Sequence, residues 1–173
     1  SITLCLSMRK FLFILFLLNS VAATAQENGP TVGTKLRSLS GKDLLTGKLI
    51  DIQFKESPGY TLLHFWHTES DSCIKDFAEI VSMEKKYHQK INVYGFPYED
   101  RQHIPRTKEY IVRYKLNWAQ LFQYKQKGLQ GANVIDVMKV DEFPTYMLLN
   151  KEGTILVRST SLMDVEAVLK SAV

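Results

Sequence analysis

Cysteine is nearly absent from this sequence. Only Cys5 and Cys73 occur among the 173 residues. Residues 1–7 carry no pattern, and we interpret them as untranslated sequence upstream of Met8, so the protein itself has one thiol. One thiol excludes an internal disulfide as a stabilising cross-link. In an exported chain, an unpaired cysteine indicates intermolecular pairing or a reactive thiol, and a buried small hydrophobic side chain is the alternative.

The sequence also lacks an apolar run long enough to cross a membrane. The N-terminal run Phe11 to Leu18 is far shorter than the roughly 20 residues that a spanning helix needs. It follows the basic segment at Met8 and precedes Ala23-Thr24-Ala25, an A-x-A cleavage signal, so residues 8–25 are predicted to be a secretory signal peptide. The cleavage site has no cysteine, which argues against a lipid-anchored form. We expect an exported, periplasmic protein without a membrane anchor after cleavage.

A strong charge of one sign is missing as well. After cleavage, 20 Lys and Arg stand against 18 Asp and Glu, a net charge of +2. This balance is too even for a nucleic-acid-binding protein, and the basic residues between 101 and 127 are typical of a solvated helix face. The remaining chain, about 150 residues, fits one domain. We expect a flexible lead-in at 26–33 and the domain at 34–173.

The hydrophobic pattern predicts alternating strands and helices. Segments 34–39 and 48–54, around Ser40-Gly41-Lys42, predict an N-terminal β-hairpin. The apolar segment Tyr60 to Trp66 predicts a buried strand, and the helix and strand that follow it predict a parallel pair. The later predicted elements are a strand at 91–96 closed by Pro97, a helix starting at Pro105, a short helix at 132–138, strands at 143–149 and 154–158, and a helix at 162–172. No element is predicted at 121–131. This order predicts one α/β sheet with helices on both faces.

The segment that carries chemistry joins the buried strand to the helix at 74–89. Residues 70–73 read Ser-Asp-Ser-Cys at the position where a C-x-x-C would indicate a thioredoxin-type redox motif. Ser70 is suited to cap the helix, and Asp71 lies in its first turn, where it favours the helix but opposes formation of a nearby thiolate.

Two segments resemble a known family. Residues 65–75 read F-W-H-T-E-S-D-S-C-I-K and resemble F-W-A-T-W-C-P-P-C-R-K of the periplasmic thioredoxin-like disulfide reductases, the TlpA/ResA group. Residues 140–153 resemble that group's V-x-x-x-P-T-x-x-L-I-D-K-x-G. The match runs from about Thr34 to the C-terminus. The resemblance implies a thioredoxin-like α/β fold, with a central mixed sheet flanked by helices and an N-terminal β-hairpin.

The resemblance also implies site residues. In this family one thiolate attacks a substrate disulfide and a second thiol, three residues on, resolves the mixed disulfide. Ser70 matches the attacking position and Cys73 the resolving one, so the usual dithiol cycle is closed to this chain. Pro144 is expected to follow a cis bond and to face Cys73, and Trp66, Phe143 and Thr145 are expected to contact substrate. Protein or peptide thiols and disulfides are the implied partners, with no cofactor.

Three alternatives remain open at this stage. In the first, Cys73 is the reactive group of a monothiol oxidoreductase that needs an external thiol. In the second, the fold is a redox-inactive peptide-binding module, which a buried Cys73 would favour. Ser70-x-x-Cys73 also matches half of the peroxiredoxin pattern, although Trp66 stands where that pattern has proline. A metal site is not expected, because His64 and His67 fall on opposite faces of a strand.

Overall fold

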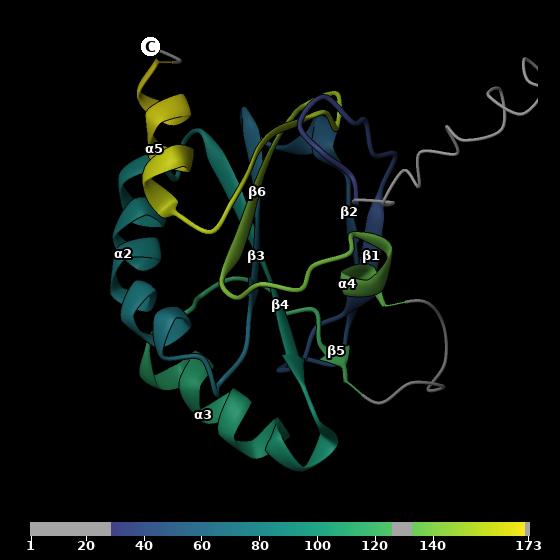
Figure 1. Ribbon diagram of the computed structural model, residues 1–173, viewed down its shortest axis with the longest axis vertical. Coiled ribbons are helices and arrows are strands. Elements are labelled where there is room, and N and C mark those ends of the chain that lie inside the picture. The colour runs from purple at the N-terminus through teal and green to yellow at the C-terminus, as the bar shows by residue number, and fades with distance from the viewer. Residues whose placement is uncertain (1–28, 126–132, 172–173) are drawn as a thin grey trace, which may run out of the picture.

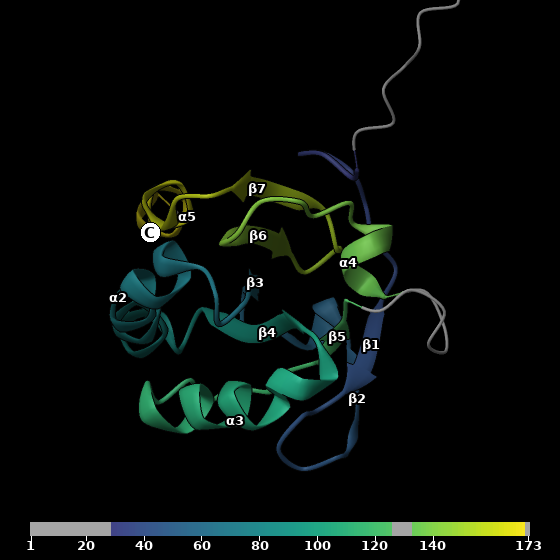
Figure 2. The same ribbon diagram turned by 60° about the horizontal axis from the view of Figure 1, so that its bottom comes forward.

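The protein is described here by a computed structural model that covers residues 29–125 and 133–171. The predicted signal peptide at 8–25 and the start of the lead-in lie outside the described residues. The central sheet has the strand order β5-β4-β3-β6-β7, and a separate hairpin is formed by β1 and β2 (Figures 1 and 2). The strands are β1 Leu39–Lys42, β2 Leu49–Ile52, β3 Tyr60–Trp66, β4 Ile91–Glu99, β5 Gln123–Tyr124, β6 Thr145–Asn150 and β7 Ile155–Ser159. The helices are α2 Asp71–Tyr87, α3 Ile104–Arg113, α4 Val134–Val137 and α5 Leu162–Ser171, with the short 3-10 helices η1 Phe54–Glu56 and η2 Arg101–His103.

Strand β3 lies in the middle of the sheet, as its nearly continuous apolar sequence predicts. It pairs in parallel with β4 and antiparallel with β6. Alternate side chains point to opposite faces of a strand, so Leu62 and Trp66 pack in one core cluster while Leu63 and Phe65 pack in the other. The predicted parallel strand–helix–strand unit is confirmed.

The two faces of the sheet are covered differently. Helices α2, α3 and α5 lie on one face, and the hairpin, η1 and the short α4 lie on the other (Figures 1 and 2). The α/β fold class with a mixed sheet and an N-terminal hairpin is therefore confirmed. Most of the helical cover is on one face, because the hairpin occupies much of the other.

Helix α2 forms because its sequence has an apolar stripe and a polar cap. Its buried side chains recur at helical spacing and face the sheet, while acidic and basic residues occupy its exposed surface. Asp71 lies in the first turn and Lys85 and Lys86 in the last, which complements the helix dipole. The buried residues are Cys73, Phe77, Ile80, Met83 and Tyr87.

Several strand boundaries differ from the sequence prediction, and β5 lies in the segment 121–131, where no element was predicted. Ser40 to Lys42 belong to β1, and the hairpin turns at 43–48, where Asp43 accepts hydrogen bonds from Thr46 and Gly47 has φ of +70°. Strand β4 continues through Pro97 to Glu99. Gly95 exchanges hydrogen bonds with residues on the side away from β3, and Pro97, two positions on, faces the same way. The proline therefore removes no donor from the β3–β4 ladder.

The C-terminal hairpin also fixes the start of the domain. β6 and β7 are joined by the predicted turn at 150–153, where Gly153 has φ of +81° and a side chain would collide with the Leu36 carbonyl. Lys35 forms a bridge to Thr154, so the segment before β1 pairs with β7 rather than with β2. Among the helices in the described part of the chain, none is long and apolar enough to cross a membrane.

Candidate functional site

The candidate site lies where β3 ends and α2 begins, beside the loop that precedes β6. Ser70 is the N-cap of α2, as predicted, and its Oγ accepts a hydrogen bond from the Cys73 backbone N–H at 3.3 Å. The same hydroxyl donates to the Phe143 carbonyl oxygen at 3.2 Å. One side chain thus joins the start of the helix to the loop at Pro144, although the two segments are far apart in sequence.

The Cys73 thiol is enclosed by protein. Its side chain is 0% exposed, and the cysteine is free. Burial raises the pKa of the Cys73 thiol, and contacts from the Ser70 hydroxyl and the His67 backbone offset only part of that rise. Because the thiolate is the nucleophilic form, a thiol in this state attacks poorly. The burial favours the interpretation of Cys73 as a small interior side chain.

The carboxylates near the thiol differ from the one expected. Asp71 is exposed, whereas Asp76 and Glu99 are the charges that raise the pKa of Cys73 after burial itself. Asp76 accepts a hydrogen bond from the Tyr146 hydroxyl at 2.9 Å. Burial, and then the charge of Asp76, raises the pKa of Tyr146. The effect of Asp71 on the thiolate stays a prediction, and Asp76 is a residue that the sequence analysis missed. The i, i+3 spacing of residues 73 and 76 was the signal that could have identified it.

The loop before β6 presents an aromatic side chain next to Ser70. The Phe143–Pro144 peptide bond is cis. The Phe143 ring is half-buried and meets the His67 ring edge-on, with centroids 4.9 Å apart. On its other side it stacks on Tyr98 at 5.7 Å. Phe143 and Tyr98 thus form an aromatic wall beside the start of α2.

Two residues expected to contact substrate lie in the interior. Trp66 is fully buried, and its Nε1–H donates to the Gln120 side-chain oxygen at 3.1 Å. Thr145 is 5% exposed, and its hydroxyl donates to the Glu142 carbonyl at 2.7 Å, which shapes the loop from within. Both side chains therefore lie beneath the surface of the site, and their contact with substrate stays a prediction. Gln120 was missed because it lies in a segment between elements, without periodicity.

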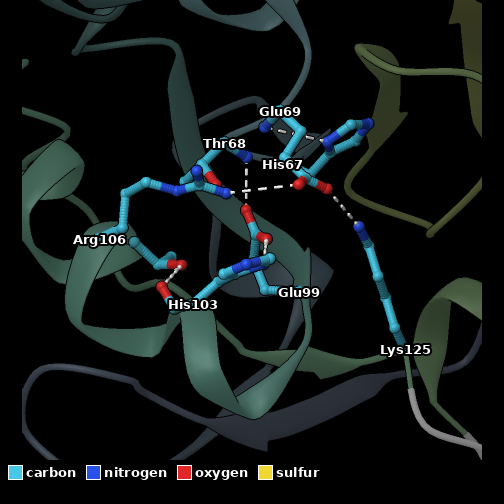
Figure 3. A network of polar contacts seen from close by, with 8 residues as sticks. His67, Thr68, Glu69, Glu99, His103, Arg106 and Lys125 are labelled. Atoms are coloured by element: carbon cyan, nitrogen blue, oxygen red, sulfur yellow. Dashed lines mark hydrogen bonds and ion pairs between the residues drawn. The ribbon is translucent and has the colours of Figure 1, made fainter.

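A polar network surrounds the turn formed by residues 67–70, here called the site turn (Figure 3). Glu99, at the end of β4, is 0% exposed, and its Oε1 accepts a hydrogen bond from the Thr68 backbone N–H. Its Oε2 lies 3.6 Å from His103 Nδ1. No sequence motif singles out Glu99; its place at the end of a buried strand beside the site was the available signal.

The outer part of the network centres on Glu69 (Figure 3). Its Oε2 lies 3.3 Å from Lys125 Nζ, and its Oε1 lies 3.7 Å from Arg106 Nη2. The Glu69 backbone N–H donates to His67 Nδ1 at 3.2 Å. The hydrogen bond and charge of Lys125 lower the pKa of the exposed Glu69 carboxyl. Thr68 and Glu69, the two central residues of the site turn, are therefore held by polar contacts from other elements.

The histidines at 64 and 67 lie in different environments. His64 is fully buried and stacks on Tyr146, with ring centroids 5.3 Å apart, while His67 lies beside Phe143 near the surface. Within residues 29–125 and 133–171, no group of three or more His, Cys, Asp and Glu side chains is arranged to hold a metal ion.

Comparison with known proteins places this arrangement in a known fold. No protein-family model matches the chain, and no curated protein sequence matches it. Solved structures do match. The thioredoxin domain of a thiol-disulfide oxidoreductase from Bacteroides vulgatus has a TM-score of 0.66 and 23% identity, covering 83% of this chain and 98% of that one. The chain has a thioredoxin-like fold.

Two further structures support the assignment of the thioredoxin-like fold. A thiol:disulfide interchange protein from Bacteroides sp. has a TM-score of 0.64 and 23% identity, covering 82% of this chain and 90% of its own. A thiol-disulfide oxidoreductase from Bacteroides fragilis has a TM-score of 0.64 and 21% identity, covering 81% of this chain and 100% of its own. Each of these matches covers more than four fifths of the chain, so the thioredoxin-like fold accounts for most of it.

Proposed function

We propose that this protein is an exported, TlpA/ResA-type member of the thiol-disulfide oxidoreductases whose site binds extended segments of other proteins without a dithiol cycle. The observation that carries this proposal is the position of Ser70. It caps α2 three residues before Cys73 and donates to the Phe143 carbonyl. A hydroxyl at this position cannot form a mixed disulfide. The backbone of the loop at Phe143 nevertheless lies next to Ser70.

The surroundings of the site support binding rather than turnover. Phe143 and Tyr98 present an aromatic surface beside Ser70, of the kind that polypeptides contact. The Cys73 thiol is buried, and its pKa is raised. The same state of the thiol disfavours the peroxidase alternative, since a peroxidase needs an accessible thiolate.

A monothiol oxidoreductase is the second candidate, favoured by the position of Cys73 in the first turn of α2. The helix dipole and the Ser70 contact both favour its thiolate. In this reaction the Cys73 thiolate attacks a substrate disulfide, forming a mixed disulfide and releasing one substrate thiolate. One external thiol then attacks the mixed disulfide at the Cys73 sulfur, releases the second substrate thiol and forms a new mixed disulfide with Cys73. A second external thiol attacks that disulfide and releases Cys73, and the two external thiols leave joined as a disulfide, so that they supply the two electrons.

The substitution Ser70→Cys tests the proposal. It would place two thiols at C-x-x-C spacing on a helix N-terminus, where a disulfide can form. Wild type is expected to show no dithiothreitol-driven reduction of insulin, whereas the variant gains this activity and shows a disulfide by mass spectrometry. Ser72→Cys is the matched control, because it adds an exposed thiol on the same helix turn at the wrong spacing.

Either of two results would contradict the proposal. Robust insulin reduction by wild type would show that Cys73 alone suffices and would favour the monothiol enzyme. A Ser70→Cys variant that never forms the disulfide would show that Ser70 does not occupy the attacking position.

A further inference from the structure

Glu99 is a buried carboxylate that the proposed binding reaction does not use. The parallel register of β3 and β4 places Trp66 beside Pro97, so two residues further on Thr68 lies beside Glu99. Here the Glu99 side chain takes the place of a backbone acceptor of β4, since Glu99 Oε1 accepts a hydrogen bond from the Thr68 backbone N–H. β5 secures the same position, because the Lys125 N–H donates to the Glu99 carbonyl at 3.1 Å.

This carboxylate is incompletely paired. Among the residues that the structure describes, Glu99 Oε2 has no hydrogen-bond partner, and the His103 Nδ1 atom lies 3.6 Å from it. A buried charge that is incompletely paired destabilises a fold relative to an apolar side chain of similar size. Residues that break such rules are expected at functional sites. We therefore infer the role of Glu99 from its hydrogen bond to the backbone of the site turn.

The site turn lies against the thiol. The Ser70 hydroxyl and the His67 backbone both contact Cys73, and the Ser70 N–H donates to the His67 carbonyl at 3.3 Å. Glu69, between them, is held from outside by Lys125 and Arg106. The turn that encloses the only thiol of the described chain is thus anchored from within by Glu99 and from the surface by an ion-pair cluster.

We propose that Glu99 is a positioning residue that keeps the site turn closed over Cys73. When the hydrogen bond from Thr68 to Glu99 breaks, the turn opens locally, the Ser70 contact to the Phe143 loop is released, and the thiol becomes accessible. The proposal rests on the proposed function and deepens it, because the position of the Phe143 loop and the accessibility of the Cys73 thiol would both depend on the site turn. It predicts a closed resting state and a less populated open state.

The experiment measures how fast a thiol reagent, 5,5′-dithiobis(2-nitrobenzoate), modifies Cys73. The protein used is the predicted mature chain from Gln26 onward, in which Cys73 is the only thiol. Glu99→Leu removes the acceptor, while Glu99→Gln keeps an oxygen for the Thr68 N–H. We expect the Leu variant to react about tenfold faster or more, the factor that one charge-assisted buried hydrogen bond provides. The Gln variant should stay within about threefold of the wild-type rate.

Low concentrations of urea separate local from global opening. A local opening exposes little surface, so the modification rate of Glu99→Leu should hardly depend on urea, whereas modification through global unfolding rises steeply. A steep urea dependence would overturn the proposal, as would equal rates for the Leu and Gln variants. Neither readout involves peptide binding or insulin reduction, so failure here is distinct from failure of the proposed function.

A surface variant keeps the proposal testable if Glu99→Leu does not fold. Glu69→Gln removes the outer anchor and should raise the modification rate about threefold, in line with an exposed ion-pair cluster. Glu166→Gln is the matched control, because Glu166 also pairs with two cations but lies between α2 and α5, away from the site turn. Equal effects of these two substitutions would overturn the proposal.

Discussion

His64 is a polar residue that is fully enclosed in the core. It lies in β3, where its ring stacks on those of Trp66 and Tyr146, and within the described part of the chain neither ring nitrogen has a hydrogen-bond partner. Burial lowers the pKa of His64 from 6.5 to about 3. The imidazole is therefore neutral at physiological pH, where it packs as an aromatic ring.

The enclosed imidazole makes stability depend on pH. Between pH 6.5 and about 3 the unfolded chain binds a proton at His64 that the folded chain cannot bind, so stability falls as the pH falls through this range. From pH 7.5 to pH 5 the wild type should lose about 2 kcal/mol more than His64→Phe, as measured by urea unfolding. The other histidines are common to both proteins and cancel. Identical pH dependence of the two proteins would contradict the assignment of a neutral, buried His64.

At the scale of elements, α2 and α5 are joined by a cluster of charges at the surface. Glu166 of α5 lies 2.8 Å from Lys86 Nζ of α2 and 3.3 Å from Lys170 Nζ, one turn further along its own helix. The Tyr87 hydroxyl also donates to it at 3.2 Å. The hydrogen bond from Lys86 contributes most to lowering the pKa of Glu166, to about 2.

The substitution Glu166→Gln should lower the thermal unfolding midpoint at pH 7. The carboxylate stabilises the folded state above its unfolded pKa of about 4.5, and this contribution is lost as the pH falls towards about 2. The difference in Tm between wild type and variant should therefore shrink on acidification and in high salt. Glu152→Gln, at an exposed carboxylate in the β6–β7 turn, serves as the control. A difference in Tm that is independent of pH would show that the charge is not responsible.

At the scale of the whole molecule, the Asp43 side chain connects the β1–β2 hairpin to the main sheet. Asp43 Oδ1 accepts a hydrogen bond from the Gln120 N–H at 2.8 Å, and the Leu44 N–H donates to the Gln120 carbonyl. Gln120 in turn accepts the Trp66 indole N–H. Residues from the hairpin, the loop before β5 and β3 thus meet next to the strand end that carries the site.

The location of the whole protein remains a prediction of the sequence. We expect the segment at 8–25 to direct export and to be cleaved after Ala25, because Ala23 and Ala25 are small residues of the kind that signal peptidase requires. N-terminal sequencing of periplasmic protein from a bacterial host should begin at Gln26. A chain lacking residues 9–25 should stay in the cytoplasm. Exported protein that retains Phe11 to Leu18 would contradict this expectation.

The sequence by itself determined the order and type of the principal elements. Period-two and period-3.6 patterns depend on which face of an element is apolar, and these patterns predicted β3, α2 and the β6–β7 hairpin. The cap at Ser70 was predictable for the same reason, since it depends on neighbours within one turn. The predicted strand boundaries at Ser40 and Pro97 were wrong. Where a strand ends there depends on which of its edges pairs with a neighbouring strand, and the local sequence does not specify that pairing.

Only the tertiary structure decided the state of the site residues. The sequence places Cys73 at a helix start, but its burial arises from packing against β3, the site turn and the segment at Phe143. The same holds for Trp66, whose indole is turned inward to Gln120, and for Glu99, which reaches Thr68 only through the register of two strands. Solvation and long-range contacts set the reactivity of a side chain, and both exist only once segments distant in the sequence have been brought together.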